Sequence, residues 1–377
     1  MPLEERRVFG YKGLEVKTSG RAGDDITRLL SSAVMGGEGG MQYTIRDIPA
    51  ILKGYGNRMR FISLWRNLSL AGVIGACARE CRLTGTAVPA TFLRFLSFRQ
   101  LYQTENPRRK GRQKARQGSE GESFRQQALN MFSKPHMLGF EGVEKSDRHL
   151  LYAFVEARNE RTKNIIQEAG YEYIRSFLTV AFSRFRPVAS GSVSPATTDD
   201  RPVIRKLVRD FYRRYSFYFD DTAFARGTWY LLRENGRIVA GVNAIPTEFV
   251  IKNVPGVWGW IMMKILPFAP WFRRLFHPRL FRFVSLGWLF HIPGRADALN
   301  PLLESVCALS GCNTALTWAD DRGPLYETLR CEVDLGTLDR MLNAKPGLVY
   351  TRFTGMSDSE KDAWYEAPVF LSGFDFT

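Results

Sequence analysis

The chain has 377 residues, of which 45% are hydrophobic and 13% aromatic; this composition supports a packed interior and excludes an intrinsically disordered chain. The length fits two domains of about 150–200 residues each. A formal net charge of +15 indicates an anionic partner, which could be nucleic acid, an acidic membrane surface or a phosphorylated cofactor.

Targeting and metal-binding signals are absent from the sequence. The N-terminus is charged and has no apolar core, so we expect no signal peptide. No apolar run of about 18 residues occurs, so we expect no membrane-spanning helix. The five cysteines and four histidines do not cluster at the short spacings of a zinc site. We therefore expect a cytoplasmic protein with reduced thiols and no metal.

The first half predicts strands, a basic loop and alternating helices and strands. Residues 60–66 and 70–83 predict a hairpin, and 91–98 a third strand. The polar, basic, glycine-containing stretch 103–121 predicts a long loop. Gly170 lies where a helix C-terminus favours a left-handed residue. The elements that follow the loop are a helix over 122–132, a strand over 150–157, a helix over 159–169 and a strand over 171–182.

The sequence of the second half predicts helices and strands in the same order as in the first half. The stretch 186–202, rich in Pro, Ser and Thr, predicts a linker, and we place the domain boundary near residue 187. Asn235-Gly236 predicts a two-residue hairpin turn. The elements are a helix over 201–215, strands over 228–233, 238–247 and 281–291, a helix over 296–309, a strand over 314–318, a helix over 324–329 and a strand over 347–353. The repeated order indicates an internal duplication.

The segment 155–171, VEARNERTKNIIQEAGY, resembles the closing motif of the GNAT family of acyl-CoA-dependent N-acyltransferases. Asn159 matches the Asn that ends the family's fifth strand, and Gly170-Tyr171 matches its closing Gly-Phe or Gly-Tyr. The resemblance implies an α/β fold of two tandem GNAT-like domains, each a mixed, splayed sheet flanked by helices. These would be 1–186, with the basic insertion 103–121, and 187–377, with an apolar insertion at 250–280.

The resemblance implies an enzyme that transfers an acyl group from acetyl-CoA or another acyl-CoA directly to a primary amine, on a small molecule or a peptide, without a metal. The pantetheine arm would enter between two parted strands and pair with exposed backbone groups. The pyrophosphate would lie on the loop before the next helix, where backbone amides and the helix dipole favour an anion. A catalytically silent tandem fold, acting as a CoA-binding or membrane-surface module, is the alternative.

Two loops are candidates for this phosphate site. In the second half, His291, Gly294, Arg295 and Ala296 follow the family's Gln/Arg-x-x-Gly-x-Gly/Ala pattern, with His in place of the first residue, and a plain turn is the alternative. In the first half the match is looser: the candidates are Arg116, Gly118 and Gly121, and residues 108–111 give a second register. We favour the second half as the one that binds the donor.

The candidate catalytic residues are divided between the halves. The family's helix tyrosine, which protonates the leaving thiolate, corresponds to Ile166 in the first half and to Tyr326 in the second. Glu156, at the end of the strand before Asn159, is a candidate base or water-orienting group, and Asn159 itself is the third candidate catalytic residue. A packed helix tyrosine and a solvated strand-end glutamate are the alternatives for Tyr326 and Glu156.

Two further segments have competing interpretations. Residues 254–276 are apolar, carry three tryptophans and are broken by prolines. They predict either an insertion buried between the domains, which we favour, or a peripheral membrane contact or acyl-chain lid. The basic loop 103–121 lacks interleaved aromatic residues, so we do not expect a nucleic-acid site there; a solvated loop, or one that reaches the 3′-phosphate of CoA, fits better.

Overall fold

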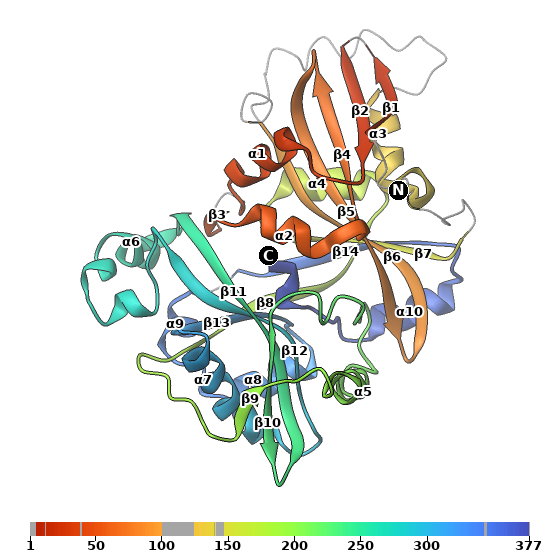
Figure 1. Cartoon of the computed structure of the whole chain (residues 1–377). Helices are drawn as coiled ribbons and strands as arrows, with labels where there is room; N and C mark the ends of the chain where they lie inside the picture. Colours follow the sequence, from red (N-terminus) through yellow and green to blue (C-terminus); the bar gives the residue numbers. More distant parts are fainter. Residues whose placement is uncertain are drawn as a thin grey trace.

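A computed structural model describes residues 5–11, 13–37, 40–99, 124–138, 140, 147–342 and 345–376. Its centre is one mixed sheet that runs through both halves of the chain, with helices on its faces (Figure 1). The sheet and its flanking helices confirm the expected α/β class. No helix in the described residues is long and apolar enough to cross a bilayer.

Fourteen described strands form this sheet. In sheet order they are β1 (Arg6–Tyr11), β2 (Leu14–Ser19), β4 (Met59–Arg66), β5 (Ser69–Leu83), β6 (Thr86–Phe98), β7 (His149–Glu156), β14 (Gly347–Thr354), β8 (Glu172–Ser183), β13 (Thr314–Asp320), β12 (Phe281–His291), β11 (Arg237–Asn253), β10 (Thr228–Glu234) and β9 (Val193–Pro195), while β3 (Gln42–Ile45) pairs with β11. The central strands β7 and β12 are almost wholly buried, which explains their continuous apolar sequences.

The helices follow the predicted alternation in most of the chain. They are α1 (Asp24–Ser32), α2 (Ile48–Tyr55), α3 (Phe124–Ser133), α4 (Glu160–Glu168), α5 (Arg201–Phe211), α6 (Gly256–Lys264), α7 (Leu299–Leu309), α8 (Pro324–Glu332), α9 (Thr337–Leu342) and α10 (Asp358–Glu366). Local signals begin several of them: Asp47 accepts a hydrogen bond from the Ala50 amide at the start of α2, and Ser357 and Glu360 form a capping box on α10.

The two halves exchange strands at the centre of the sheet. β14, from the end of the chain, lies between β7 and β8 and is antiparallel to both. β8, from the first half, pairs with β13 of the second half. The sheet is not divided at residue 187, because strands from each half pair with strands from the other. The domain boundary near this residue therefore stays a prediction from the sequence.

Two pairs of neighbouring strands run parallel for only a short distance and then part. β6 and β7 pair from Ala90–Leu150 to Leu93–Ala153, although both strands continue beyond these residues. β12 and β13 pair at Val284–Ala315 and Ser285–Leu316 and likewise continue. Each half thus contains the parted parallel pair that the GNAT resemblance implies.

The C-terminal segment, residues 368–376, lies in the opening between β12 and β13. The Ser285 hydroxyl donates a hydrogen bond to the Gly373 carbonyl at 2.5 Å, and the Val369 amide donates to Asp320 at 2.8 Å. A Cβ on Gly373 would lie 2.3 Å from the Leu286 carbonyl oxygen. The chain therefore fills the opening of its second half with its own end, which lies near the centre of the molecule in Figure 1.

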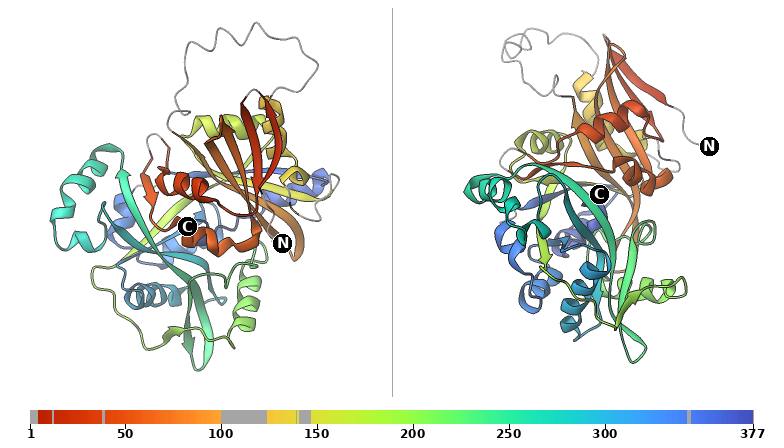
Figure 2. Two further views of the ribbon diagram at one scale, coloured as in Figure 1. Left: turned by 45° about the horizontal axis from the view of Figure 1, so that its top comes forward. Right: turned by 60° about the vertical axis from the view of Figure 1, so that its left-hand side comes forward.

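The apolar insertion differs from the expectation that we favoured. Trp258, Trp260 and Trp271 are more than half exposed, so the segment does not bury its tryptophans between the halves. It forms α6 and two short 3₁₀ turns that project from the end of β11, as Figure 2 shows. The prediction of burial was based on composition alone. Composition does not show whether other elements of the fold pack over an apolar segment.

Candidate functional site

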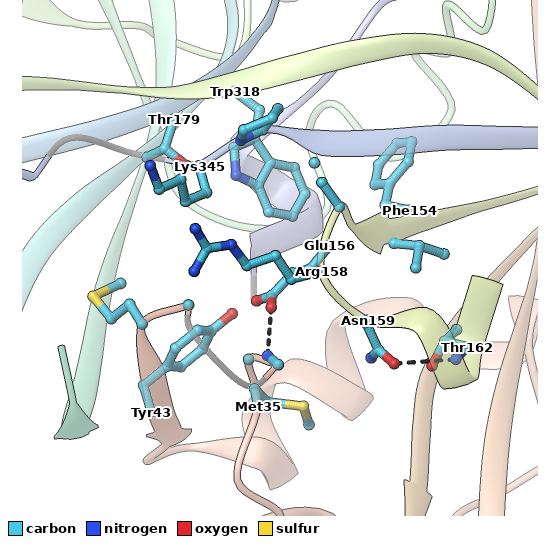
Figure 3. A pocket seen from close by; sticks show the side chains of 18 of the residues that line it. Met35, Tyr43, Phe154, Glu156, Arg158, Asn159, Thr162, Thr179, Trp318 and Lys345 are labelled. Carbon is cyan, nitrogen blue, oxygen red and sulfur yellow. Dashed lines mark hydrogen bonds between the residues drawn. The ribbon is translucent and has the colours of Figure 1, made fainter. Parts of the chain in front are cut away.

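A large cavity lies where β6 and β7 part, between the first half and β11–β13 of the second. Its volume is about 570 Å³, within the range of pockets that enclose small-molecule ligands. The walls come from β6, β7, α4, the loop before β3, the start of α6 and the segment before β14. Most lining side chains are apolar, and a few polar and charged groups lie among them (Figure 3).

Aromatic side chains form much of the wall on the sheet side. Phe154, Phe177 and Trp318 come from three different strands, and their ring centroids lie 5.0–5.7 Å apart. Phe92 lies 4.8 Å from Phe154. Such rings provide a rigid apolar surface for a ligand.

Glu156 is one of two carboxylates among the described residues that line this cavity, and the other, Asp375, is paired with Arg79. It ends β7, and its Oε2 accepts a hydrogen bond from the Gly37 amide. Burial raises the pKa of Glu156, although the bond from Gly37 opposes this shift. Glu156 is thus a half-buried carboxylate with a backbone hydrogen bond at the cavity wall, and its role as a base stays a prediction.

A glycine-rich loop between α1 and β3 closes over Glu156. A Cβ on Gly37 would lie 2.8 Å from Glu156 Oε2, and one on Gly40 would lie 3.0 Å from it, so larger residues would displace the carboxylate. Tyr43 follows on β3, and its ring stacks on Phe249 of β11 at 4.2 Å. Burial and then the charge of Glu156 raise the pKa of Tyr43, which keeps its hydroxyl protonated and able to donate.

Asn159 holds the start of α4 at the edge of the cavity. Its Oδ1 accepts a hydrogen bond from the Thr162 amide at 3.0 Å, which is an N-cap interaction. Arg158 and Lys345 are exposed and also line the cavity, and Figure 3 shows both among its lining side chains. Asn159 is thus a structural cap beside the cavity, and the two cations make that part of the wall positive.

Arg94 adds a buried cation to the same wall. It donates a hydrogen bond to the Tyr55 hydroxyl, and burial lowers its pKa to about 10. Its guanidinium lies over the Phe95 ring at 3.8 Å from the ring centroid. A buried arginine next to an apolar cavity is a group that can bind a carbonyl or phosphate oxygen.

The candidate residues of the second half do not line this cavity. The Tyr326 hydroxyl accepts a hydrogen bond from Arg330 Nε at 3.1 Å, and its partly buried side chain packs against the core. His291 ends β12, and its ring contacts Phe211 at 5.1 Å. The structure brings Glu156 and Asn159 together but places Tyr326 and His291 elsewhere.

The predicted phosphate loop of the second half is an exposed turn with its own ion pairs. Arg295 donates to both carboxylate oxygens of Glu234 at 2.6 Å and also pairs with Asp297. Gly294 has φ +75°, and a Cβ there would contact nothing within 4 Å. Ala296 begins a 3₁₀ turn (Ala296–Ala298). Two acidic partners therefore already neutralise the cation that would bind a phosphate.

The first-half loop candidates, Arg116, Gly118 and Gly121, lie outside the described residues, as does the second register at 108–111. The sequence analysis also missed several cavity residues, namely Gly37, Gly40, Tyr43, Arg94 and Lys345. One signal was available: the run MGGEGG at 35–40 predicts a close backbone approach. No group of three or more metal-ligating side chains occurs in the described ranges.

The chain is a mixed α/β protein with one large mixed sheet flanked by helices, and comparison with solved structures finds proteins that share this fold. Saccharomyces cerevisiae N-myristoyltransferase with bound myristoyl-CoA is similar at TM-score 0.55 and 9% identity, covering 94% of this chain and 87% of that one. A second structure of that enzyme gives TM-score 0.53 and 10% identity, covering 91% and 80%. A GCN5-related N-acetyltransferase from Kribbella flavida gives only 0.47 at 12% identity, covering 91% and 72%. No protein-family model matches the chain, and no curated protein matches it.

Proposed function

We propose that the chain is an N-acyltransferase that takes an acyl group from acyl-CoA and binds this donor in the first half, where β6 and β7 part. The observation that carries the proposal is Glu156, a carboxylate with a raised pKa, in an apolar cavity at the parted strands. The fold shared with N-myristoyltransferase supports acyl transfer as the reaction class.

In the proposed reaction, Glu156 accepts a proton from the ammonium group of the acceptor. The neutral amine then attacks the thioester carbonyl carbon, a new C–N bond forms, and the C–S bond breaks to release CoA thiolate. The attacking nitrogen loses its second proton as the amide forms, and this proton balances the one that the CoA thiolate takes up on departure. Arg94 and the Tyr43 hydroxyl, which line the same cavity, are the proposed donors to the carbonyl oxygen. Arg158 and Lys345 attract the phosphates of the donor, and the acceptor is a primary amine on a small molecule or a peptide.

The assignment to the first half reverses our sequence-based preference. The C-terminal segment occupies the corresponding opening of the second half, and Arg295 is neutralised there by Glu234 and Asp297. Both the C-terminal segment and the ion pairs of Arg295 disfavour a donor site in the second half. Roles at such a site therefore stay untested predictions for Tyr326, His291, Gly294 and Ala296. A cytoplasmic location likewise stays a prediction.

Two matched substitutions test which half binds the donor. Thr162→Glu places a carboxylate in the proposed cavity, and we expect it to weaken acyl-CoA binding about tenfold because like charges repel. Gly294→Glu adds the same charge to the second-half loop and should leave the affinity unchanged. Isothermal titration of acyl-CoA measures both. Loss of binding in the Gly294 variant, with none in the Thr162 variant, would return the donor site to the second half.

The cavity volume predicts a donor longer than acetyl-CoA. An acetyl group would leave most of the apolar wall without contacts, whereas each added CH₂ that is buried should tighten binding about three- to fourfold. We expect affinity to rise along a series from acetyl- to myristoyl-CoA until the cavity is full. Titration with non-hydrolysable analogues of the series measures this, and a flat series would restrict the donor to short acyl groups.

A catalytically silent CoA-binding fold is the second candidate, because the tyrosine position of the first half is Ile166. Incubation with acyl-CoA and a library of primary amines separates the two. Amide product supports the enzyme, and tight binding of acyl-CoA without turnover on any amine supports the silent module.

A further inference from the structure

Residues 254–276 form an exposed aromatic projection. Its outward side chains are 49–85% exposed, and Figure 1 shows α6 extending from one side of the molecule. These side chains are Val257, Trp258, Trp260, Ile265, Phe268 and Trp271. Every tryptophan that is exposed among the described residues lies in this projection. The feature is therefore a localised patch and not the scattered apolar exposure common on protein surfaces.

Buried apolar side chains, which we call the anchor, fix the projection to the core. Met262, Phe272, Leu275 and Phe276 are at most 1% exposed, and Phe272 and Phe276 pack their rings 6.4 Å apart. The anchor fixes one side of the projection against the core and leaves the other side without cover. Helix α6 carries apolar side chains nearly all round, yet only Gly259 and Met262 are buried. A helix of this composition is normally buried in a core or in a membrane.

The charge around the projection indicates which kind of partner binds it. No Asp or Glu occurs between Glu248 and Asp297, whereas Lys264, Arg273 and Arg274 are exposed on the projection itself. No ion pair among the described residues involves these three cations. Two copies of this face would bring like charges together, so a second copy is disfavoured. An anionic lipid surface provides both the apolar layer for the tryptophans and the negative charge for the cations.

We propose that the aromatic projection docks the protein on the surface of an anionic membrane. The segment is too short and too broken by Pro255, Pro267 and Pro270 to cross a bilayer, so its aromatic side chains insert at the depth of the headgroups. The start of α6, including Val257 and Trp258, also lines the large cavity. Docking therefore places the rim of the cavity at the lipid surface, and a lipid-borne amine or a long acyl chain could enter from there.

The test is vesicle co-sedimentation of the full chain without any acyl-CoA, so that its result does not depend on the proposed acyl transfer. We expect binding to vesicles that contain phosphatidylglycerol, weak binding to pure phosphatidylcholine, and a decrease with salt. Arg273→Ala with Arg274→Ala should lower the partition coefficient roughly thirtyfold. The matched control is Arg213→Ala with Arg214→Ala, an adjacent exposed pair beyond α5, which should bind as the wild type does.

A second variant tests the aromatic side chains. Trp260→Ser, Phe268→Ser and Trp271→Ser together should lower partitioning roughly a hundredfold, whereas Leu68→Ser, at an exposed residue outside the projection, should have no effect. Failure of the wild type to bind anionic vesicles overturns the proposal. Equal binding by the wild type and the projection variants also overturns it. A concentration-dependent dimer that the triple substitution abolishes would assign the face to a second copy.

Discussion

Replacing Glu156 with Gln should lower the rate of acyl transfer roughly 10²–10⁴-fold while acyl-CoA still binds. Gln keeps the shape of the side chain but cannot take the proton from the acceptor ammonium, which is the contribution expected of a general base. Steady-state kinetics with the amine found in the library screen measures the rate, and titration measures donor binding. The effect should therefore appear in kcat with little change in donor affinity.

The pH dependence gives this prediction a signature that a structural role would not produce. Because burial raises the pKa of Glu156, the wild-type rate should fall as pH decreases through that raised value, where the carboxylate becomes protonated. The residual activity of the Gln variant should lack this acidic limb. Glu160→Gln is the control: this glutamate is exposed, is the first residue of α4 and pairs with Lys163, so the rate should not change.

Stability provides an independent check on the same residue. A raised carboxyl pKa means that the folded state disfavours the ionised form, so Glu156 destabilises the fold above its folded pKa and Gln removes this penalty. At neutral pH the Gln variant should be at least as stable as the wild type, and the difference should vanish at low pH, where both states hold the proton. A loss of stability, or an unchanged rate, would contradict the assignment of Glu156 as the base.

The sequence predicted the elements that local signals define. Asn235-Gly236 adopts φ values of +48° and +75°, which the mirror-image hairpin turn requires. Gly170 has φ +80° after α4, and β12 has the predicted bounds Phe281–His291. At the two turns one or two residues decide the backbone conformation, and in β12 a continuous apolar run does, so neighbouring residues are sufficient for the prediction.

The pairing of distant strands could not be predicted in this way. Residues 347–353 were correctly predicted as a strand, but the apolar alternation of β14 does not specify that it lies between β7 and β8. Likewise, nothing in residues 368–376 indicates that they fill the opening between β12 and β13. Such contacts depend on the shape of the partners and on long-range packing, which a single sequence does not display.

Only part of the candidate site could be predicted, because long-range packing assembles the rest of it. Glu156 and Asn159 belong to one contiguous motif, so the resemblance located them. Tyr43 and Gly37 belong to a segment more than a hundred residues earlier in the chain, and only the fold brings them to Glu156. The second-half loop matched a phosphate pattern, yet Glu234 from β10 neutralises Arg295, which the six-residue pattern could not reveal.

Replacing Asp375 with Asn should lower the free energy of unfolding by about 3–5 kcal/mol. Asp375 forms an ion pair with Arg79 of β5, and both side chains are at most 1% exposed. The same guanidinium donates to the Tyr152 hydroxyl at 2.7 Å and lies over the Phe219 ring at 4.0 Å from its centroid. Removal of the carboxylate charge leaves Arg79 buried without compensation, so the folded state carries an unpaired charge.

The size of this effect depends on burial and not on ion pairing as such. Arg295 and Glu234 make the same two-bond contact at the surface, so Glu234→Gln is the matched control and should leave stability within error of the wild type. Urea unfolding followed by circular dichroism measures both variants. Equal effects in the two pairs would contradict this explanation.

A double variant separates the cost of the unpaired charge from the loss of the contact. Arg79→Met with Asp375→Leu removes both charges and should recover much of the stability that Asp375→Asn loses, because apolar side chains can replace a buried ion pair. Since Asp375 also lines the cavity and belongs to the last turn of the segment that fills the second opening, the single variant should loosen this segment as well. Limited proteolysis near the C-terminus should then be faster in Asp375→Asn than in the double variant. Equal cleavage rates in the two variants would show that the ion pair does not hold the C-terminal segment in place.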